Sequence, residues 1–255
     1  MKSKLLLVLG GLLLIAVIIF LDIAAQEFLL KNNILSVSVM SVNETTDLYN
    51  IKAEYPQFNG ISPEFNKKIS SLMEEKIATF KKDSLDNWEA RKATATLEFP
   101  VPDKPEELFV YQANWTPAQI NNKYISVVLN IYFFSGGAHG SEEIYTFNYD
   151  VVNKEEITIE KLLGSQESLE KISDMAKAYI IAFQKSQGIE MDEFLTQMVN
   201  EGAGPAYSNY QYFTFNANNI VFYFQRYQVA PGSAGSFTFP VDKGILKEIG
   251  GNLSL

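Results

Sequence analysis

Residues 129–149, with the sequence LNIYFFSGGAHGSEEIYTFNY, place two aromatic-rich runs on either side of a turn that contains three glycines. Apolar residues occupy every second position on both sides of this turn, at Ile125, Val127, Leu129, Ile131 and Phe133 before it and at Tyr145, Phe147, Tyr149 and Val151 after it. A period of two is typical of strands that bury one face. The stretch therefore predicts a β-hairpin, in which Gly136, Gly137 and Gly140 permit a sharp connection and a close approach by another group.

Core packing alone must stabilise this hairpin, because none of the 255 residues of the chain is a cysteine. With 47% hydrophobic residues, the chain can bury the core of one or two domains. The lack of cysteine also excludes thiol nucleophiles and zinc sites built from thiolates. The single histidine, His139, excludes sites that need two histidines, which include most zinc hydrolase centres.

Residues 1–25 predict a membrane anchor or a signal segment. Residues 5–21 carry no charge and follow two lysines, a pattern that places the N-terminus in the cytoplasm. As a helix they span about 25 Å, the short end of the lengths that cross a bilayer. This apolar run exceeds that of a usual cleaved signal, and Ala24-Ala25 offers a poor cleavage context. We therefore expect a single-pass anchor at the cell membrane with the C-terminal part extracytoplasmic; if the segment is cleaved instead, the protein is secreted.

The charge balance of the chain restricts its partners. The whole chain has a net charge of −9, and its first 21 residues hold two lysines and no acid, so the remainder carries 19 basic and 30 acidic residues, a net charge of −11. Such a surface disfavours nucleic acid and anionic lipid as partners and favours a basic protein or a cationic ligand. Solubility alone is the simpler explanation.

The pattern of the exported part predicts an α+β fold. Besides the hairpin, strands are predicted over residues 35–39, 49–55, 109–115, 212–215, 220–227 and 236–241. Ser62 and Ser165 are predicted helix caps, and residues 189–199 predict a shorter helix. Hairpins dominate, which favours a mainly antiparallel sheet with helices packed on one face, preceded by one N-terminal transmembrane helix. A weak boundary near residues 151–154 divides this part into domains over 34–150 and 151–250.

The carboxylates do not complete a catalytic site in the sequence. Glu142 and Glu143 follow His139 closely enough for a cation site with one histidine and two carboxylates, but a turn histidine bonded to the backbone is the commoner case. The same pair, and Glu155 with Glu156, suggests acid and base catalysis across a sugar bond. Adjacent residues on a strand point to opposite faces, however. We therefore predict no catalytic residue, no metal site, no cofactor and no enzymatic activity.

Two loops are predicted to bind a ligand instead. Residues 227–232, Tyr-Gln-Val-Ala-Pro-Gly, follow a predicted strand. They form either a merely constrained loop or, with the turn at 136–140, a recognition rim that a rigid sheet positions. The candidate ligand-binding residues are Tyr132, Phe134, Gly136, Gly137, His139, Gly140, Glu142, Tyr227, Pro231 and Gly235.

Residues 132–140, YFFSGGAHG, resemble the Y-x-Y-T-G-G-A-H-G signature of an exported domain pair of unknown function. That pair forms the ectodomain of RsiV-type anti-sigma factors and the accessory region of PdaC-type peptidoglycan deacetylases. Residues 147–163 and 227–235 are also similar to this family, and the likeness covers about residues 34–247. Phe134-Ser135 stands where Tyr-Thr is usual, and residues 231–233 replace Pro-Tyr-Ala, which puts a partner contact by the terminal loop's tyrosine in doubt.

The resemblance implies a PdaC-type accessory domain over residues 34–150 and an RsiV-type C-terminal domain over residues 151–250. RsiV-type proteins sense lysozyme and hold a sigma factor, whereas PdaC-type enzymes carry a separate catalytic domain with an aspartate and two histidines on a metal. With four residues before the apolar segment and one histidine, we expect neither part in this chain.

The combined expectation is a non-enzymatic, membrane-tethered binding module of the bacterial envelope. It would recognise cell-wall glycan or a basic protein such as lysozyme. One alternative is a cell-wall glycan hydrolase that uses carboxylates near the hairpin, such as Glu142 or Asp150. A structural envelope protein is the other.

Overall fold

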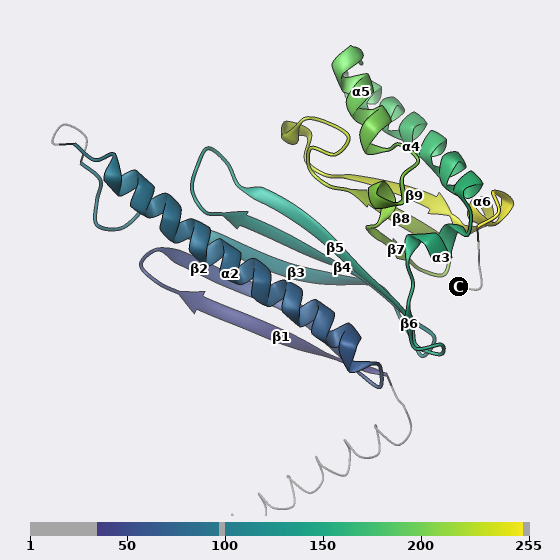
Figure 1. Cartoon of the computed structure of the whole chain (residues 1–255), viewed down its shortest axis with the longest axis horizontal. Helices are drawn as coiled ribbons and strands as arrows, with labels where there is room; N and C mark the ends of the chain where they lie inside the picture. The colour runs from purple at the N-terminus through teal and green to yellow at the C-terminus, as the bar shows by residue number, and fades with distance from the viewer. Residues whose placement is uncertain (1–34, 97–99, 252–255) are drawn as a thin grey trace, which may run out of the picture.

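The computed structural model describes residues 35–96 and 100–251 (Figure 1). The predicted membrane segment at residues 5–21 lies outside this range. Within the range, no helix is long and apolar enough to cross a membrane.

A six-stranded sheet forms the first part of the molecule, with its strands in chain order. Its strands are β1 (Ser36–Thr45), β2 (Tyr49–Asn59), β3 (Phe109–Ile120), β4 (Tyr124–Phe134), β5 (Ser141–Asp150) and β6 (Glu155–Glu156). Neighbouring strands are antiparallel except β2 and β3, which run parallel. Helix α2 (Pro63–Ala93) connects these two, because parallel strands need a long crossover. The predicted hairpin is confirmed as β4 and β5.

Helix α2 lies across one face of this sheet (Figure 1). The predicted cap is confirmed, since Ser62 Oγ accepts a hydrogen bond from the Glu64 backbone N–H at 3.2 Å and Pro63 opens the helix. The helix buries an apolar stripe against the inward face of β2 to β5, and its buried members are Phe65, Ile69, Met73, Phe80 and Trp88. The opposite face of the sheet, at the hairpin end, is not covered by α2.

The second part has its own sheet and its own helices. Its strands are β7 (Phe213–Phe215), β8 (Asn219–Phe224) and β9 (Phe237–Asp242), all antiparallel. Its helices are α3 (Ile159–Leu163), α4 (Gln166–Ser186), α5 (Glu193–Gly202) and α6 (Lys243–Glu248), with the short turns η1 (Tyr207–Tyr210) and η2 (Gly232–Ala234). The predicted cap of α4 is confirmed, since Ser165 Oγ accepts from the Ser168 N–H at 3.1 Å.

The fold is therefore α+β with mostly antiparallel strands, as predicted, but the strands are divided between two sheets. Each sheet has a separate buried core, one from residues 51–149 and the other from residues 157–246. The division follows from β6, which has only two residues and ends the first sheet. The next stretches of chain form helices that cover β7 to β9 (Figure 1).

Polar side chains join the two sheets along the edge of β7. Asn148 Nδ2 donates to the Phe213 carbonyl at 2.7 Å, and Thr146 Oγ1 accepts from the Phe213 N–H at 3.1 Å. Ser126 Oγ accepts from the Phe215 N–H at 2.8 Å and donates to Asn148 Oδ1 at 2.7 Å. These bonds replace a backbone ladder, because they satisfy edge groups that would otherwise be buried without partners. We call Ser126, Thr146 and Asn148 the polar seam.

Candidate functional site

The hairpin connection is held against the C-terminal half of α2. Asn87 Nδ2 donates to the Ser135 carbonyl at 2.8 Å. Gly136 has a φ of +109°, and a side chain at this position would point at Asn87 and the ring of Phe109. Gly137 has a φ of +101°, and a side chain there would point into open space. Positive φ values of this kind favour glycine. The glycines predicted from sequence thus set the path of the connection.

Tyr132 and Gly140 lie together at the start and the end of this connection. The ring of Tyr132 lies so close to the Gly140 backbone that a side chain on residue 140 has no room. The ring nevertheless remains 40% exposed. Because Gly140 has no side chain, the ring of Tyr132 packs directly on its backbone and still remains accessible.

A second tyrosine lies on a second glycine in the loop between β8 and β9. Tyr227 has a φ of +68°, which is uncommon for a residue with a side chain. Its ring occupies the space that a side chain on Gly232 would need, and it is 56% exposed. A residue held in a sparsely populated backbone conformation with an exposed ring is typical of functional loops.

Arg226 connects these two tyrosine–glycine pairs. Its Nη1 donates to the Gly140 carbonyl and its Nε to the Gly232 carbonyl, each at 2.7 Å, across a separation of 86 residues for the first bond. Its guanidinium also lies 5.4 Å from the centre of the Tyr227 ring, a cation–π contact. We call Tyr132, Gly140, Arg226, Tyr227 and Gly232 the tyrosine rim. The two loops predicted to form a rim are brought together, but Arg226 was not among the candidates.

A polar pocket of about 240 Å³ borders Tyr132 on the sheet face away from α2. The polar side chains that line it are those of Gln112, Asn114, Asn130, Tyr132, Glu142 and Ser236. We call it the amide pocket. The register of β4 with its two neighbours explains why these side chains meet. Asn130 pairs with both Asn114 and Ile144, and Tyr132 pairs with both Gln112 and Glu142. Alternate residues of these three strands therefore share one face.

No hydrogen bond within the described residues engages the side chains of Gln112, Asn114, Asn130, Glu142 or Ser236. Amide groups both donate and accept hydrogen bonds, and a carboxylate accepts them. The pocket thus presents several free polar groups beside an exposed ring. Of these residues the sequence singled out only Glu142, because polar residues on the outer face of a strand look like an ordinary solvated surface.

The remaining predicted candidates have structural contacts. Phe134 packs its ring edge-to-face on Phe109, with 5.9 Å between ring centres. His139 is exposed, and its Nδ1 lies 3.0 Å from the Gly140 carbonyl, the arrangement of a turn histidine. Pro231 and Gly235 flank η2, and Gly235 has a φ of +75°.

The paired acids point apart, as the strand geometry predicts. Glu143 faces α2 and pairs with Lys76 at 2.7 Å, whereas Glu142 lines the amide pocket on the other side of the sheet. Burial lowers the pKa of Lys76, but its bonds to Glu143 and Tyr145 outweigh this effect and raise that pKa above its usual value. Burial raises the pKa of Tyr145 to about 12.

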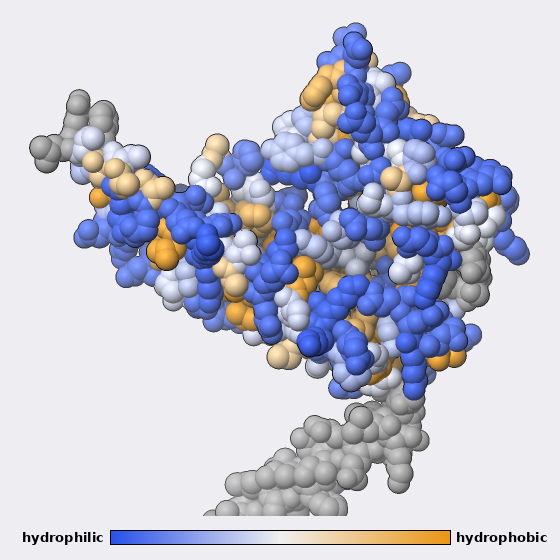
Figure 2. Space-filling view, viewed as in Figure 1, coloured by the Kyte–Doolittle hydropathy of each residue, from blue (hydrophilic) through white to orange (hydrophobic). Residues whose placement is uncertain are grey.

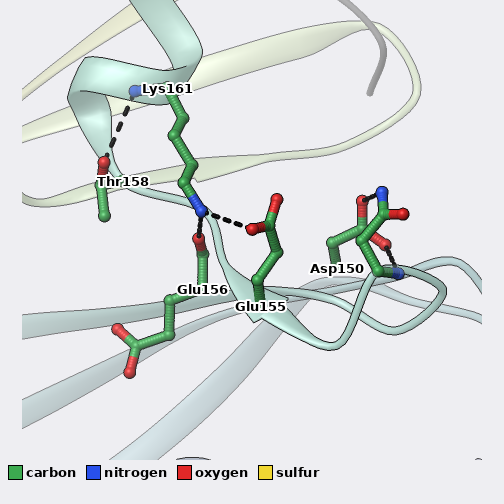
Figure 3. Close-up of polar contacts among 6 residues, drawn as sticks. Asp150, Glu155, Glu156, Thr158 and Lys161 are labelled. Atoms are coloured by element: carbon green, nitrogen blue, oxygen red, sulfur yellow. Dashed lines mark hydrogen bonds and ion pairs between the residues drawn. The ribbon is translucent and has the colours of Figure 1, made fainter.

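Figure 3 shows the other acids, with the carboxylates of Glu155 and Glu156 directed away from each other. Glu155 pairs with Lys161 at 2.8 Å, and Glu156 pairs with Lys68. Asp150 accepts bonds from the backbone N–H of Val152 at 2.9 Å and of Asn153 at 2.8 Å. These carboxylates hold turns and ion pairs, and the described part of the chain contains no group of three metal-ligating side chains suited to a metal ion.

Comparisons with known proteins match two regions of the chain. Residues 42–142 match the family model described as deacetylase PdaC, and residues 160–243 match that of a protein of unknown function, DUF3298. The peptidoglycan-N-acetylmuramic acid deacetylase PdaC of Bacillus subtilis is 26% identical over 215 residues. That similarity covers 84% of this chain and 42% of the relative, so the chain spans less than half the length of the curated relative it matches.

Two solved structures share the fold. A DUF3298-family protein from Bacteroides fragilis aligns with a TM-score of 0.56 and 14% identity, covering 84% of this chain and 92% of that chain. A DUF3298-family protein from Pseudomonas aeruginosa aligns with a TM-score of 0.53 and 14% identity, covering 84% and 93%. At this identity the likeness concerns the fold alone.

The resemblance to RsiV-type ectodomains stays a prediction. The two family models and the Bacillus subtilis relative support the other half of the expectation. The chain is similar to the PdaC-type accessory region, with a PdaC-like stretch followed by a DUF3298-like stretch.

Proposed function

We propose that this protein is an extracytoplasmic binding module that holds cell-wall glycan at the tyrosine rim and the amide pocket. One observation carries the proposal: polar side chains without partners among the described residues converge beside the exposed ring of Tyr132, which packs on Gly140. Groups fixed in this way lose little conformational freedom on binding, which favours affinity.

The chemistry of the site suits a sugar. A pyranose ring has an apolar C–H face and a polar edge of hydroxyl groups. A tyrosine ring offers a rigid apolar face with a polar tip, and the amides of Asn114 and Asn130 match hydroxyl groups as donors and as acceptors. Glu142 adds one strong acceptor to the same pocket.

The similarity to a peptidoglycan deacetylase supports cell-wall glycan as the ligand class. In this proposal residues 5–21 tether the module to the cell membrane, and the described part lies outside it. The proposal assigns no bond cleavage to its carboxylates: Asp150, Glu155 and Glu156 are engaged in turns and ion pairs, and Glu142 accepts hydrogen bonds from the ligand.

A basic protein such as lysozyme is a second candidate partner. The acidic balance of the chain, with 30 Asp and Glu against 21 Lys and Arg, would attract such a protein over a distance. Glu142 is an acid at the pocket without a basic partner among the described residues. Attraction of this kind weakens at higher salt.

The test is a pull-down of the purified full chain with insoluble peptidoglycan, in parallel with immobilised lysozyme, at two salt concentrations. We expect retention on peptidoglycan that persists at high salt, and about tenfold weaker binding for Tyr132→Ala and for Asn130→Ala. Tyr179→Ala is a matched control, because Tyr179 on α4 is also 40% exposed, and it should bind normally.

Each other outcome has a defined meaning. If the chain is retained on lysozyme and not on peptidoglycan, and this retention is lost at high salt, the partner is a basic protein and not glycan. Failure to bind either ligand, or equal losses for Tyr132→Ala and Tyr179→Ala, would refute the proposed site. Release of muropeptides by the wild type but not by Glu142→Gln would favour the hydrolase alternative.

A further inference from the structure

A larger hollow lies where the two parts of the molecule meet, along a different stretch of β5. Its volume is about 590 Å³, within the usual range for small-molecule sites. Its walls come from α2, β5, residues 156–160 and the residues in and after η1. The space-filling view shows the surface hollowed between the part that carries α2 and the part that carries α4 (Figure 2). We call this hollow the cleft.

Three tyrosines face the cleft from both parts of the molecule. Tyr145 comes from β5, whereas Tyr207 and Tyr212 come from the chain around η1. The rings of Tyr145 and Tyr212 meet edge-to-face with 5.7 Å between their centres. All three are half-buried, so each ring keeps part of its surface accessible. Apolar side chains, among them Leu72 and Ile157, also line the cleft.

The edge of β5 leaves the backbone N–H and C=O of Thr146 open in the cleft. The backbone N–H and C=O of Ile144 point away from β4, as their two bonds to the side chain of Gln225 show. The Asn148 carbonyl points the same way and accepts from the Ile157 N–H at 3.0 Å. The register between β4 and β5 is regular, and outward groups recur at every second residue of an antiparallel edge. The N–H and C=O of Thr146 therefore also point outward, and no bond to them occurs outside the ladder in the described residues.

The bonds on either side of Thr146 select the shape of its partner. A peptide that extended the sheet would also need the outward N–H and C=O of Ile144 and the outward C=O of Asn148, and these three groups are already bonded. A compact ligand with one amide group needs only the Thr146 N–H and C=O. Such a group donates one hydrogen bond and accepts one, so it satisfies both open backbone atoms.

We propose that the cleft binds an N-acetylated amino sugar. The acetamido group bonds to the Thr146 backbone, its methyl group contacts Leu72 and Ile157, and the sugar ring lies against Tyr207 and Tyr212. This site is separate from the tyrosine rim, so it stands or falls independently of the function proposed there.

The test compares an oligomer of N-acetylglucosamine with the same oligomer after removal of its acetyl groups, each titrated into the full chain by calorimetry. We expect the acetylated oligomer to bind at least tenfold more tightly. In a parallel ¹⁵N NMR titration the backbone amide signal of Thr146 should shift. Tyr207→Ala, and Ser208→Trp, which fills the cleft from an exposed position, should each weaken binding about tenfold.

A cleft variant separates the two proposals, because Ser208→Trp fills the cleft and does not change the tyrosine rim. The control Tyr179→Ala lies outside both sites and should bind the acetylated oligomer normally. Equal binding of the two oligomers, no binding of either, a loss caused by Tyr132→Ala but not by Ser208→Trp, or tighter binding of an acetylated dipeptide amide would each overturn the assignment.

Discussion

The face of the six-stranded sheet that points away from α2 has two ends that use similar residues in opposite ways. At one end, the polar seam of Ser126, Thr146 and Asn148 bonds to the edge of β7. At the other end, Asn114 and Asn130 lie on the same face, and no hydrogen bond within the described residues engages their side chains. Residue type alone therefore does not separate structural polar groups from groups available to a ligand. The difference lies in burial and in the presence of a partner strand.

The largest expected effect is at the polar seam. Asn148→Ala should lower the free energy of unfolding by about 2–3 kcal/mol, because it removes two hydrogen bonds and leaves the buried Phe213 carbonyl without a partner. Chemical denaturation of the full chain measures this change. A loss below about 0.5 kcal/mol would show that the seam does not stabilise the contact between the sheets.

The next effect concerns Arg226, which connects the two loops of the tyrosine rim. Arg226→Met should cost about 1–2 kcal/mol, because it removes charge-assisted bonds to two backbone carbonyls. It should also weaken retention on peptidoglycan more than a change in stability explains. Arg91→Met, at an exposed position on α2, is the control and should retain normal binding. Normal binding by Arg226→Met would separate the rim from function.

The free energy of unfolding should depend on pH through Tyr145, which is half-buried on the α2-facing side of β5. The pKa of Tyr145 is raised from 10 to about 12 by burial, so between these pH values the unfolded chain loses a proton that the folded chain keeps. The free energy of unfolding therefore falls as pH rises through this window. Tyr145→Phe should make that fall less steep in denaturation curves recorded from pH 9 to 12. Identical slopes for the two proteins would contradict the burial of this hydroxyl.

The smallest effect is expected at the amide pocket. Asn130→Ala should change the free energy of unfolding by less than about 0.5 kcal/mol, because no bond in the described part of the chain is lost. The same denaturation experiment measures it beside Asn148→Ala. A cost as large as that of Asn148→Ala would mean that Asn130 is structural.

The sequence predicted local features better than long-range ones. Alternation along β4 and β5 located the hairpin, and the caps at Ser62 and Ser165 followed from short-range chemistry. The contact of Arg226 with Gly140 joins residues far apart in the chain, and nothing local marks it. The separation into two sheets also depends on tertiary packing, because alternation does not show which strands share a ladder.

The candidate site was predicted in the same uneven way. Tyr132, Gly140 and Tyr227 were candidates because glycines and aromatic residues stand out in loops. Asn114 and Asn130 were not, because polar residues at alternate strand positions are ordinary on a solvated face. Only the cross-strand register shows that they converge on one pocket.

The most direct test of the central claim is an NMR titration of the full chain with soluble peptidoglycan fragments, followed through the side-chain amide signals of asparagine. The signals of Asn114 and Asn130 should shift as ligand is added, while the signal of Asn66, whose amide donates to the Phe58 carbonyl, should stay in place. Fragments that bind without moving the first two signals would contradict a glycan site in the amide pocket.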